Sequence, residues 1–325
     1  MSPAITQYEP SPSVEAFLRR EKGINAEQTW KNRRTDLKDF EQWWRENNGD
    51  DIIHARPLDI EPFFFERADD GYAAKTIKSR YNSLSAFYRY LSQKRELIEE
   101  SPFESMDRKD YNRFMSGTKK SEITRDKISY VTTEQAEQLA ENVANPRLRN
   151  ELLIKLAFQT GLREGELASI ELSDIDRDDR SIKIRAEKTH ENRTVYYQPS
   201  LDMLLQQWIN GGYRDSYSKA GESQYLFLSI HAPKLESARV NKVVKQAAEN
   251  AGIQETMYVD MAGNERKKIT SHALRHGHAV ESLKSGIDVR TVQKHLGHAE
   301  LDMTMRYLQL IEDDVKQSYQ QFGSR

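Results

Sequence analysis

Cysteine is absent from the 325 residues, which excludes a disulfide framework and a thiolate metal site. The sequence also lacks a long apolar run and the pattern of a signal peptide, so it predicts neither a membrane span nor an exported protein. Internal repeats and low-complexity tracts are missing too. Because 31% of the residues are charged, we expect a cytoplasmic globular protein with no membrane partner.

A strong excess of positive charge is missing as well. The chain has 49 Lys and Arg against 51 Asp and Glu, whereas nucleic-acid-binding proteins usually carry a basic excess. Any binding of an anion therefore depends on local clusters. Basic residues gather at Trp30–Arg34, Lys75–Arg80, Lys119–Lys120 and Arg266–Lys268, and acidic ones at Asp50–Asp51, Glu99–Glu100 and Glu312–Asp314. This partition allows a positive face on a neutral molecule, although each cluster alone also fits a solvated surface of mixed charge.

The spacing of apolar residues divides the chain into two domains. We predict a flexible tail over 1–10, a helical N-terminal domain over 11–103, a linker over 104–127, a second domain over 128–310 and a C-terminal tail helix over 311–325. The predicted fold class is mainly α. It combines a four-helix domain with a mixed α+β, mostly helical domain that contains a small antiparallel sheet.

Aromatic residues are frequent in the N-terminal domain and recur at helical intervals. Trp30, Phe40 and Trp44 share one face of the second predicted helix, and Tyr81 and Phe87 share one face of the fourth. This spacing is typical of a packed helix face, so it favours a core over a platform for stacking bases.

The second domain opens with a capping-box pattern from Thr132 to Gln135, which predicts the start of a helix. Further on, Gly161 interrupts an apolar helix and places Arg163 at the start of the next one. Two alternating segments, Ser181–Arg185 and Arg193–Tyr197, predict a β-hairpin with Lys188 in its loop.

The most informative stretch runs from Ser271 to Leu310 and is predicted to form three short helices. Ser271, Asp288 and Asp302 are the expected N-caps, and glycines follow the first two helices. His272 and Arg275 are three residues apart and share a helix face. His298 follows the glycine that ends the second helix, and Tyr307 lies in the third. An arginine, two histidines and a tyrosine suit chemistry at a phosphate.

The ordered set His-x-x-Arg, then Leu-Gly-His, then a tyrosine nine residues on resembles the C-terminal half of the tyrosine recombinase (lambda integrase) family. Thr160–Leu167 is similar to the first arginine motif of that family, including the acid at Glu166, and the hairpin around Lys188 is similar to the one that presents its catalytic lysine.

The resemblance implies a site-specific DNA recombinase or integrase that needs no metal or other cofactor. The implied catalytic residues are Arg163, Lys188, His272, Arg275, His298 and Tyr307. In this scheme the tyrosine attacks the scissile phosphate, a 3′-phosphotyrosyl link forms, and the reaction leads to strand exchange through a Holliday junction. The implied partners are double-stranded DNA with a specific site and further copies of the chain, as a tetramer on synapsed DNA. When bound to DNA the protein is expected at the nucleoid.

Further DNA contacts are expected from basic residues at three places. They are Lys75, Lys78 and Arg80 near the start of the fourth helix, Lys119 and Lys120 in the linker, and Arg266, Lys267 and Lys268 before the His-x-x-Arg helix.

Three alternatives stay open at this point. His272 and His276 are spaced i, i+4, and His278, His295 and His298 are near in sequence, which raises a metal site; it lacks the glutamate of a His-Glu-x-x-His motif and includes an arginine. A type IB topoisomerase shares the chemistry without exchanging partners. A DNA-binding protein without catalysis is the third.

Overall fold

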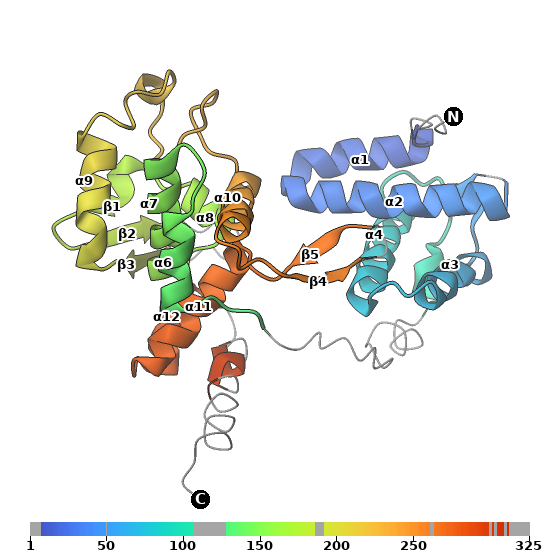
Figure 1. The fold of residues 1–325 in the computed structure, drawn as a ribbon. Helices are drawn as coiled ribbons and strands as arrows, with labels where there is room; N and C mark the ends of the chain where they lie inside the picture. The colour runs from blue at the N-terminus through green and yellow to red at the C-terminus, as the bar shows by residue number, and fades with distance from the viewer. Residues whose placement is uncertain are drawn as a thin grey trace, which may run out of the picture. The chain divides into compact units, whose positions relative to one another are not determined.

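The computed structural model describes residues 8–49, 51–106, 128–185, 192–260, 263–298, 301, 304–308 and 311. The chain divides into two compact units, Met1–Thr124 (unit 1) and Arg125–Arg325 (unit 2). Helices make up most of both units and the paired strands are antiparallel, which confirms the predicted fold class (Figure 1). Within the described ranges, no helix combines the length and apolarity that a bilayer crossing requires.

In the described part of unit 1, four α-helices surround an aromatic core. They are α1 (Pro12–Ile24), α2 (Glu27–Asn47), α3 (Pro57–Asp69) and α4 (Ala74–Gln93), with short 3-10 turns at Ile52–His54 and Pro102–Glu104. The aromatic stripes form the core as predicted, because each of five large rings is at most 2% exposed: Phe17, Phe40, Trp44, Phe63 and Phe87. Several of these rings meet edge to face, as Phe40 and Phe63 do at 5.1 Å between centroids.

Arg80 belongs to this interior, which corrects its prediction as a DNA contact. The residue is 7% exposed, its Nε lies 2.8 Å from Oδ2 of Asp39, and its guanidinium carbon lies 4.1 Å from the centre of the Tyr72 ring. Asp39 also accepts hydrogen bonds from Arg67 on α3. Because this ion pair ties α2 to α3 and α4, Arg80 stabilises unit 1 and offers no charge to a ligand.

The described part of unit 2 contains seven labelled α-helices (Figure 1). They are α6 (Thr133–Glu141), α7 (Arg147–Thr160), α8 (Glu164–Ala168), α9 (Asp202–Asn210), α10 (Ser237–Asn250), α11 (Ser271–Lys284) and α12 (Val289–Leu296), and 304–308 are helical as well.

The predicted capping box of Thr132 and Gln135 is present at α6. Thr270 caps α11 through its side chain, so Ser271 is the first residue of that helix and the prediction of Ser271 as the cap was wrong. Asp288 caps α12 as predicted, and Asp302 lies outside the described residues.

Among the residues of unit 2 that the structure describes, the strands form two small sheets. β1 (Ile175–Asp176), β2 (Ser181–Ile184) and β3 (Arg193–Tyr196) form a three-stranded sheet, and β4 (Thr256–Val259) pairs with β5 (Glu265–Lys267). In the first sheet Ile182 faces Val195 and Ile184 faces Arg193, which sets the register of the predicted hairpin. Short 3-10 turns lie at Leu172–Asp174, Pro199–Leu201 and Ala220–Glu222. The hairpin loop that holds Lys188 lies outside the described residues.

α11 packs against both α7 and α12 (Figure 1). The approach is close at Gly277, where an added Cβ atom would lie 2.1 Å from the carbonyl oxygen of Val131. α7 and α12 each end at a glycine in the left-handed conformation, Gly161 with φ of +61° and Gly297 with φ of +66°. These two glycines bring the last turns of α7 and α12 to the same place, beside the first half of α11.

Candidate active site

The guanidinium of Arg275 lies between the ends of α7 and α12. Its NH1 donates to the carbonyl of Gly161 at 2.6 Å, and its NH2 donates to the carbonyl of Leu296 at 2.9 Å. Both carbonyls lie at the C-terminal end of a helix, where the helix dipole favours a cation. A residue on one helix therefore joins the ends of two others.

Arg275 is 5% exposed and yet remains charged. Burial lowers its pKa to about 10, and the neighbouring Arg163 lowers the pKa further while Glu166 opposes the shift. A pKa of about 10 still leaves the guanidinium protonated at neutral pH. The site thus has a fixed positive charge with little water around it, which strengthens its attraction for an anion.

Arg163 supplies the second positive charge. It is the N-cap residue of α8, and its NH1 donates to Oε1 of Glu166 at 3.2 Å. Its NH2 lies 3.4 Å from the carbonyl oxygen of Gly297, beside the carbonyl that Arg275 holds. The side chain is 43% exposed, so this guanidinium is more accessible to a ligand than that of Arg275, which is 5% exposed. The acid three residues after Arg163 orients it, as the sequence suggests.

Arg193 also belongs to the site, although the sequence analysis did not assign it a role. From the first position of β3 it donates to both carboxylate oxygens of Glu166, at 2.8 and 2.9 Å, and to the carbonyl of His295 at 2.8 Å. Burial favours a raised pKa for Glu166, but the hydrogen bonds from Arg193 and Arg163 outweigh it and the pKa is lowered. Arg193 therefore fastens the hairpin to α8 and α12, and only the tertiary structure reveals it.

Tyr307 is the predicted nucleophile, and it lies in a small cluster formed by α11 and α12. The residue is 3% exposed and packs with Val280, Val292 and Leu296. Its ring is stacked on that of His298, with 6.3 Å between centroids and 25° between planes. Burial raises the pKa of the phenol, and the charges of Arg275 and Arg163 act in the opposite direction. The tyrosine is thus protonated at neutral pH, and it lies close enough to both guanidinium groups for their charges to act on its pKa.

The hydroxyl of Tyr307 is hydrogen-bonded to a residue that the sequence analysis left outside the catalytic set. Nδ1 of His276 lies 2.8 Å from the phenol oxygen. Burial lowers the pKa of His276 to about 4, so the ring is neutral at pH 7 and can accept this hydrogen bond. Because burial lowers the pKa of His276 and raises that of the phenol, the proton stays on Tyr307, so His276 holds the phenol and does not ionise it. The i, i+4 spacing indicates that His276 shares a face of α11 with His272, but it does not indicate that Tyr307 packs there.

His298 is held beneath the tyrosine by its own contacts. Its Nδ1 is 2.9 Å from Oγ1 of Thr304, and its backbone N–H donates to the carbonyl of Gln293. Burial, followed by the charge of Arg275, lowers its pKa to about 4. A neutral His298 can donate a hydrogen bond to a phosphate oxygen through the ring nitrogen that Thr304 leaves unused.

His272 is the most exposed member of the predicted set. Its side chain is 67% exposed, and its Nδ1 lies 3.7 Å from Oε1 of Glu164 on α8. Its ring centre is 6.5 Å from that of His276, one turn further along α11. Five of the six predicted residues therefore lie near the C-terminal ends of α7 and α12 and the start of α8. The sixth, Lys188, lies outside the described residues.

The basic residues predicted to contact DNA have different surroundings. Lys75 and Lys78 are exposed on α4, and Lys119 and Lys120 lie outside the described residues. On the second hairpin each basic side chain pairs with an acidic one: Arg266 with Asp260 at 2.7 Å, Lys267 with Glu265 at 2.6 Å and Lys268 with Glu255 at 2.9 Å.

Among the residues that the structure describes, no group of three or more His, Asp or Glu side chains could hold a metal ion.

Comparison with known proteins places this arrangement in a family. Residues 129–313 match the model of the phage integrase family, and residues 15–95 match that of the phage integrase N-terminal SAM-like domain. The chain belongs to the phage integrase family, which confirms the resemblance to tyrosine recombinases. It is a site-specific DNA recombinase enzyme of that family.

The similarity to individual relatives extends over nearly the whole chain. A tyrosine recombinase XerD of Staphylococcus haemolyticus is 25% identical over 312 residues, which cover 95% of this chain and 96% of the relative. A tyrosine recombinase XerC of Lacticaseibacillus casei is 23% identical over 293 residues, which cover 89% and 90%.

Two solved structures show the same fold. XerH recombinase bound to palindromic difH substrate aligns with a TM-score of 0.68 at 19% identity, over 94% of this chain and 82% of that one. A lambda integrase dimer bound to a COC′ core site aligns with a TM-score of 0.62 at 18% identity, over 91% and 93%.

The buried histidines predict that unit 2 loses stability in mild acid. Burial lowers the pKa of His276 and His298 to about 4 and that of His278 to about 3, below the unfolded value of about 6.5. The unfolded state therefore binds more protons below pH 6.5, and stability that is complete above that pH falls as the pH decreases. Between pH 7.5 and 5.5 each such group removes about 1.4 kcal/mol.

This loss is measured from the urea unfolding of unit 2 at the two pH values. His278→Gln should reduce the loss by about 1.4 kcal/mol, because one of the three groups no longer titrates. His231→Gln, at an exposed position, is the matched control and should leave the loss unchanged. A pH dependence that is the same in wild type and His278→Gln would show that His278 is not buried as described.

Proposed function

We propose that the chain cleaves and rejoins DNA by attack of Tyr307 on the scissile phosphate. The bond between phosphorus and the 5′-oxygen breaks, a 3′-phosphotyrosyl link forms, and a free 5′-hydroxyl leaves. Arg163 and Arg275 stabilise the negative charge that grows on the phosphate oxygens. His298 donates a hydrogen bond to one of them, His272 assists proton transfer, and Lys188 gives the leaving oxygen its proton.

One observation carries the proposal: the phenol of Tyr307 lies within the field of both guanidinium groups, which the chain collects from α8 and α11. Their charges act to lower the pKa of the phenol against the effect of burial. A tyrosine is a weak nucleophile unless cations stabilise its anion, and these two cations also suit the phosphate it would attack. The same positive charge therefore serves the nucleophile and the substrate.

In the present conformation the nucleophile is held away from solvent. The phenol is hydrogen-bonded to His276 and the residue is 3% exposed. A phosphate can reach the hydroxyl only after this hydrogen bond opens. We infer that the hydrogen bond between Tyr307 and His276 opens when DNA binds, so that the phenol oxygen can reach the phosphate.

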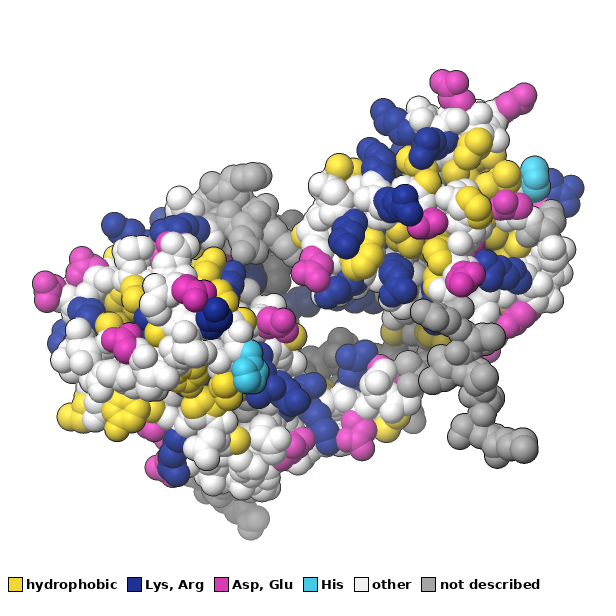
Figure 2. Space-filling view, turned by 90° about the horizontal axis from the view of Figure 1, so that it is seen from above, with side chains coloured by type: hydrophobic (Ala, Val, Ile, Leu, Met, Phe, Trp, Pro, Cys, Tyr) yellow, Lys and Arg dark blue, Asp and Glu magenta, His cyan; other side chains and the backbone are white. Residues whose placement is uncertain are grey.

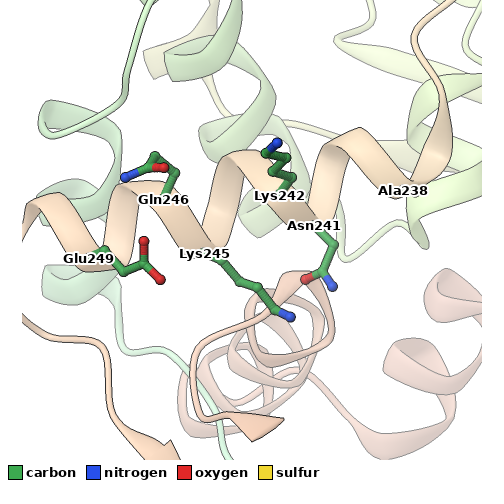
Figure 3. A pocket seen from close by; sticks show the side chains of 6 residues that line it. All are labelled: Ala238, Asn241, Lys242, Lys245, Gln246 and Glu249. Atoms are coloured by element: carbon green, nitrogen blue, oxygen red, sulfur yellow. The ribbon is translucent and has the colours of Figure 1, made fainter. Parts of the chain in front are cut away.

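The contact with DNA is proposed to include α10 and exposed lysines of α4. Asn241, Lys242, Lys245 and Gln246 line a hollow of about 330 Å³ on α10 (Figure 3). This helix adjoins the catalytic residues, because Asn241 accepts a hydrogen bond from the backbone of Ser271. On the face of unit 1 seen in Figure 2, Lys and Arg side chains lie between hydrophobic ones, which suits a polyanion on a chain of low net charge.

The finer consequences follow from the chemistry of the covalent link. The phosphotyrosyl ester retains the energy of the broken bond, so the 5′-hydroxyl of a partner strand can reverse the reaction without a cofactor. Exchange of two strands in this way gives a Holliday junction, and recombination of two duplexes requires four active sites. We therefore propose a tetramer on synapsed DNA that carries a specific site, with the protein in the cytoplasm or at the nucleoid.

A suicide substrate, nicked close to the cleavage site, tests the proposal. The wild-type chain should form a covalent adduct that denaturing gel electrophoresis detects, and mass spectrometry should place the nucleotide on Tyr307. Tyr307→Phe should form none while it binds the same duplex with a Kd within about twofold of wild type, since it loses only one hydroxyl. The cleaved duplex is first found by selection from random sequences.

The alternatives give different results in the same assay. Normal binding of DNA without an adduct in the wild-type chain would contradict the proposal and favour a DNA-binding protein without catalysis. An adduct accompanied by plasmid relaxation, with no recombination of two sites, would favour a topoisomerase.

The α10 contact predicts a change in salt dependence. Lys242→Met should reduce the slope of log Kd against log salt concentration by about one and weaken binding of all sequences alike, because one phosphate contact is lost. Lys219→Met, which removes an exposed lysine paired with Glu222, is the control and should keep the wild-type slope. An unchanged slope for Lys242→Met would remove α10 from the proposed surface.

A further inference from the structure

Glu164, the first residue of α8, is hydrogen-bonded to Ser271 at the start of α11, and Ser271 is in turn hydrogen-bonded to α10. The hydroxyl of Ser271 donates to its carboxylate, and the backbone N–H of Ser271 donates to Oδ1 of Asn241 at 3.1 Å. Lys245, one turn beyond Asn241 on α10, acts electrostatically on the same carboxylate. Figure 3 shows Asn241 and Lys245 pointing to the same side of α10, away from Lys242 and Gln246.

This carboxylate is ionised and faces His272. Its side chain is 23% exposed, and burial favours a raised pKa, but the interactions with His272 and Ser271 outweigh burial and the pKa is lowered. The distance from its Oε1 to Nδ1 of His272 is 3.7 Å. That separation is longer than a hydrogen bond, and a small rotation of the exposed imidazole would shorten it.

We propose that Glu164 is a positioning residue for His272. A carboxylate beside Nδ1 favours the tautomer with its proton on Nδ1, and it fixes the plane of the ring. Nε2 then points away from Glu164 with a free lone pair and is presented to the DNA. The inference rests on the proposed function, because it assigns His272 the proton-transferring nitrogen.

A purely structural role for Glu164 is the competing explanation. As an anion beside the first turn of α11, it also favours that helix through the dipole and through Ser271. Glu164→Gln separates the two roles, because the amide still accepts a hydrogen bond from Ser271 while the charge that selects the tautomer is lost. Glu164→Asp keeps the charge on a shorter side chain.

The experiment compares single-turnover adduct formation on the suicide substrate. Glu164→Gln should react about 10- to 100-fold more slowly than wild type with a Kd for DNA within about twofold, and Glu164→Asp should recover part of the rate. Glu151→Gln is the matched control, because Glu151 is similarly exposed at 27% and pairs with Lys155 on α7. It should react at the wild-type rate.

A second readout reports on the imidazole and does not depend on cleavage. In ¹⁵N-histidine-labelled protein, the signal that disappears in His272→Gln should show the Nδ1–H tautomer in the wild-type chain and shift toward Nε2–H in Glu164→Gln. Wild-type rate and tautomer in Glu164→Gln would overturn the inference. So would a variant that loses only stability and reacts normally per folded molecule.

Failure of the proposed function would look different. If the wild-type chain formed no adduct at Tyr307, the assignment of the reaction would fall, and the tautomer measurement would still decide whether Glu164 orients His272.

Discussion

The joint between α7, α11 and α12 depends on the buried guanidinium of Arg275. Arg275 donates to the last carbonyls of α7 and α12, and each of those carbonyls is turned toward it because the helix ends at a left-handed glycine. A buried cation of this kind is stable only while such acceptors are present. The remaining site follows from that joint. Arg163 reaches the carbonyl of Gly297 next to it, and Arg193 fastens the hairpin to the carbonyl of His295.

Around this joint the arginines are charged and the neighbouring histidines are neutral. The arginines stay protonated, whereas burial beside them keeps His276 and His298 neutral. A neutral His276 accepts from Tyr307, and a neutral His298 lies under the phenol ring. Fixed positive charge thus lies close to a protonated phenol, and the proposed attack of Tyr307 on a phosphate depends on this arrangement.

Periodicity and capping signals were sufficient to predict most of the fold. The four helices of unit 1, the capping box before α6, and the glycine ends of α7 and α12 all depend on local sequence, and the structure has each of them. Contacts between distant segments were not predictable. Arg80 fits the pattern of a surface cation, but it pairs with Asp39 of α2. Arg193 binds Glu166, which is 27 positions away, and His276 is hydrogen-bonded to Tyr307, which is 31 positions away. Spacing along α11 shows which side chains share a face, but it does not show what packs against that face.

Hydrogen exchange in Arg275→Lys tests most directly whether this guanidinium joins the two helices. Lysine keeps the charge but lacks the planar fork that reaches both carbonyls. Hydrogen bonds to a charged group are worth about 1.5–3 kcal/mol, so protection of the amides in α12 should fall roughly 10- to 100-fold, with α9 unchanged as the internal reference. Equal protection of α12 in wild type and Arg275→Lys would contradict the account.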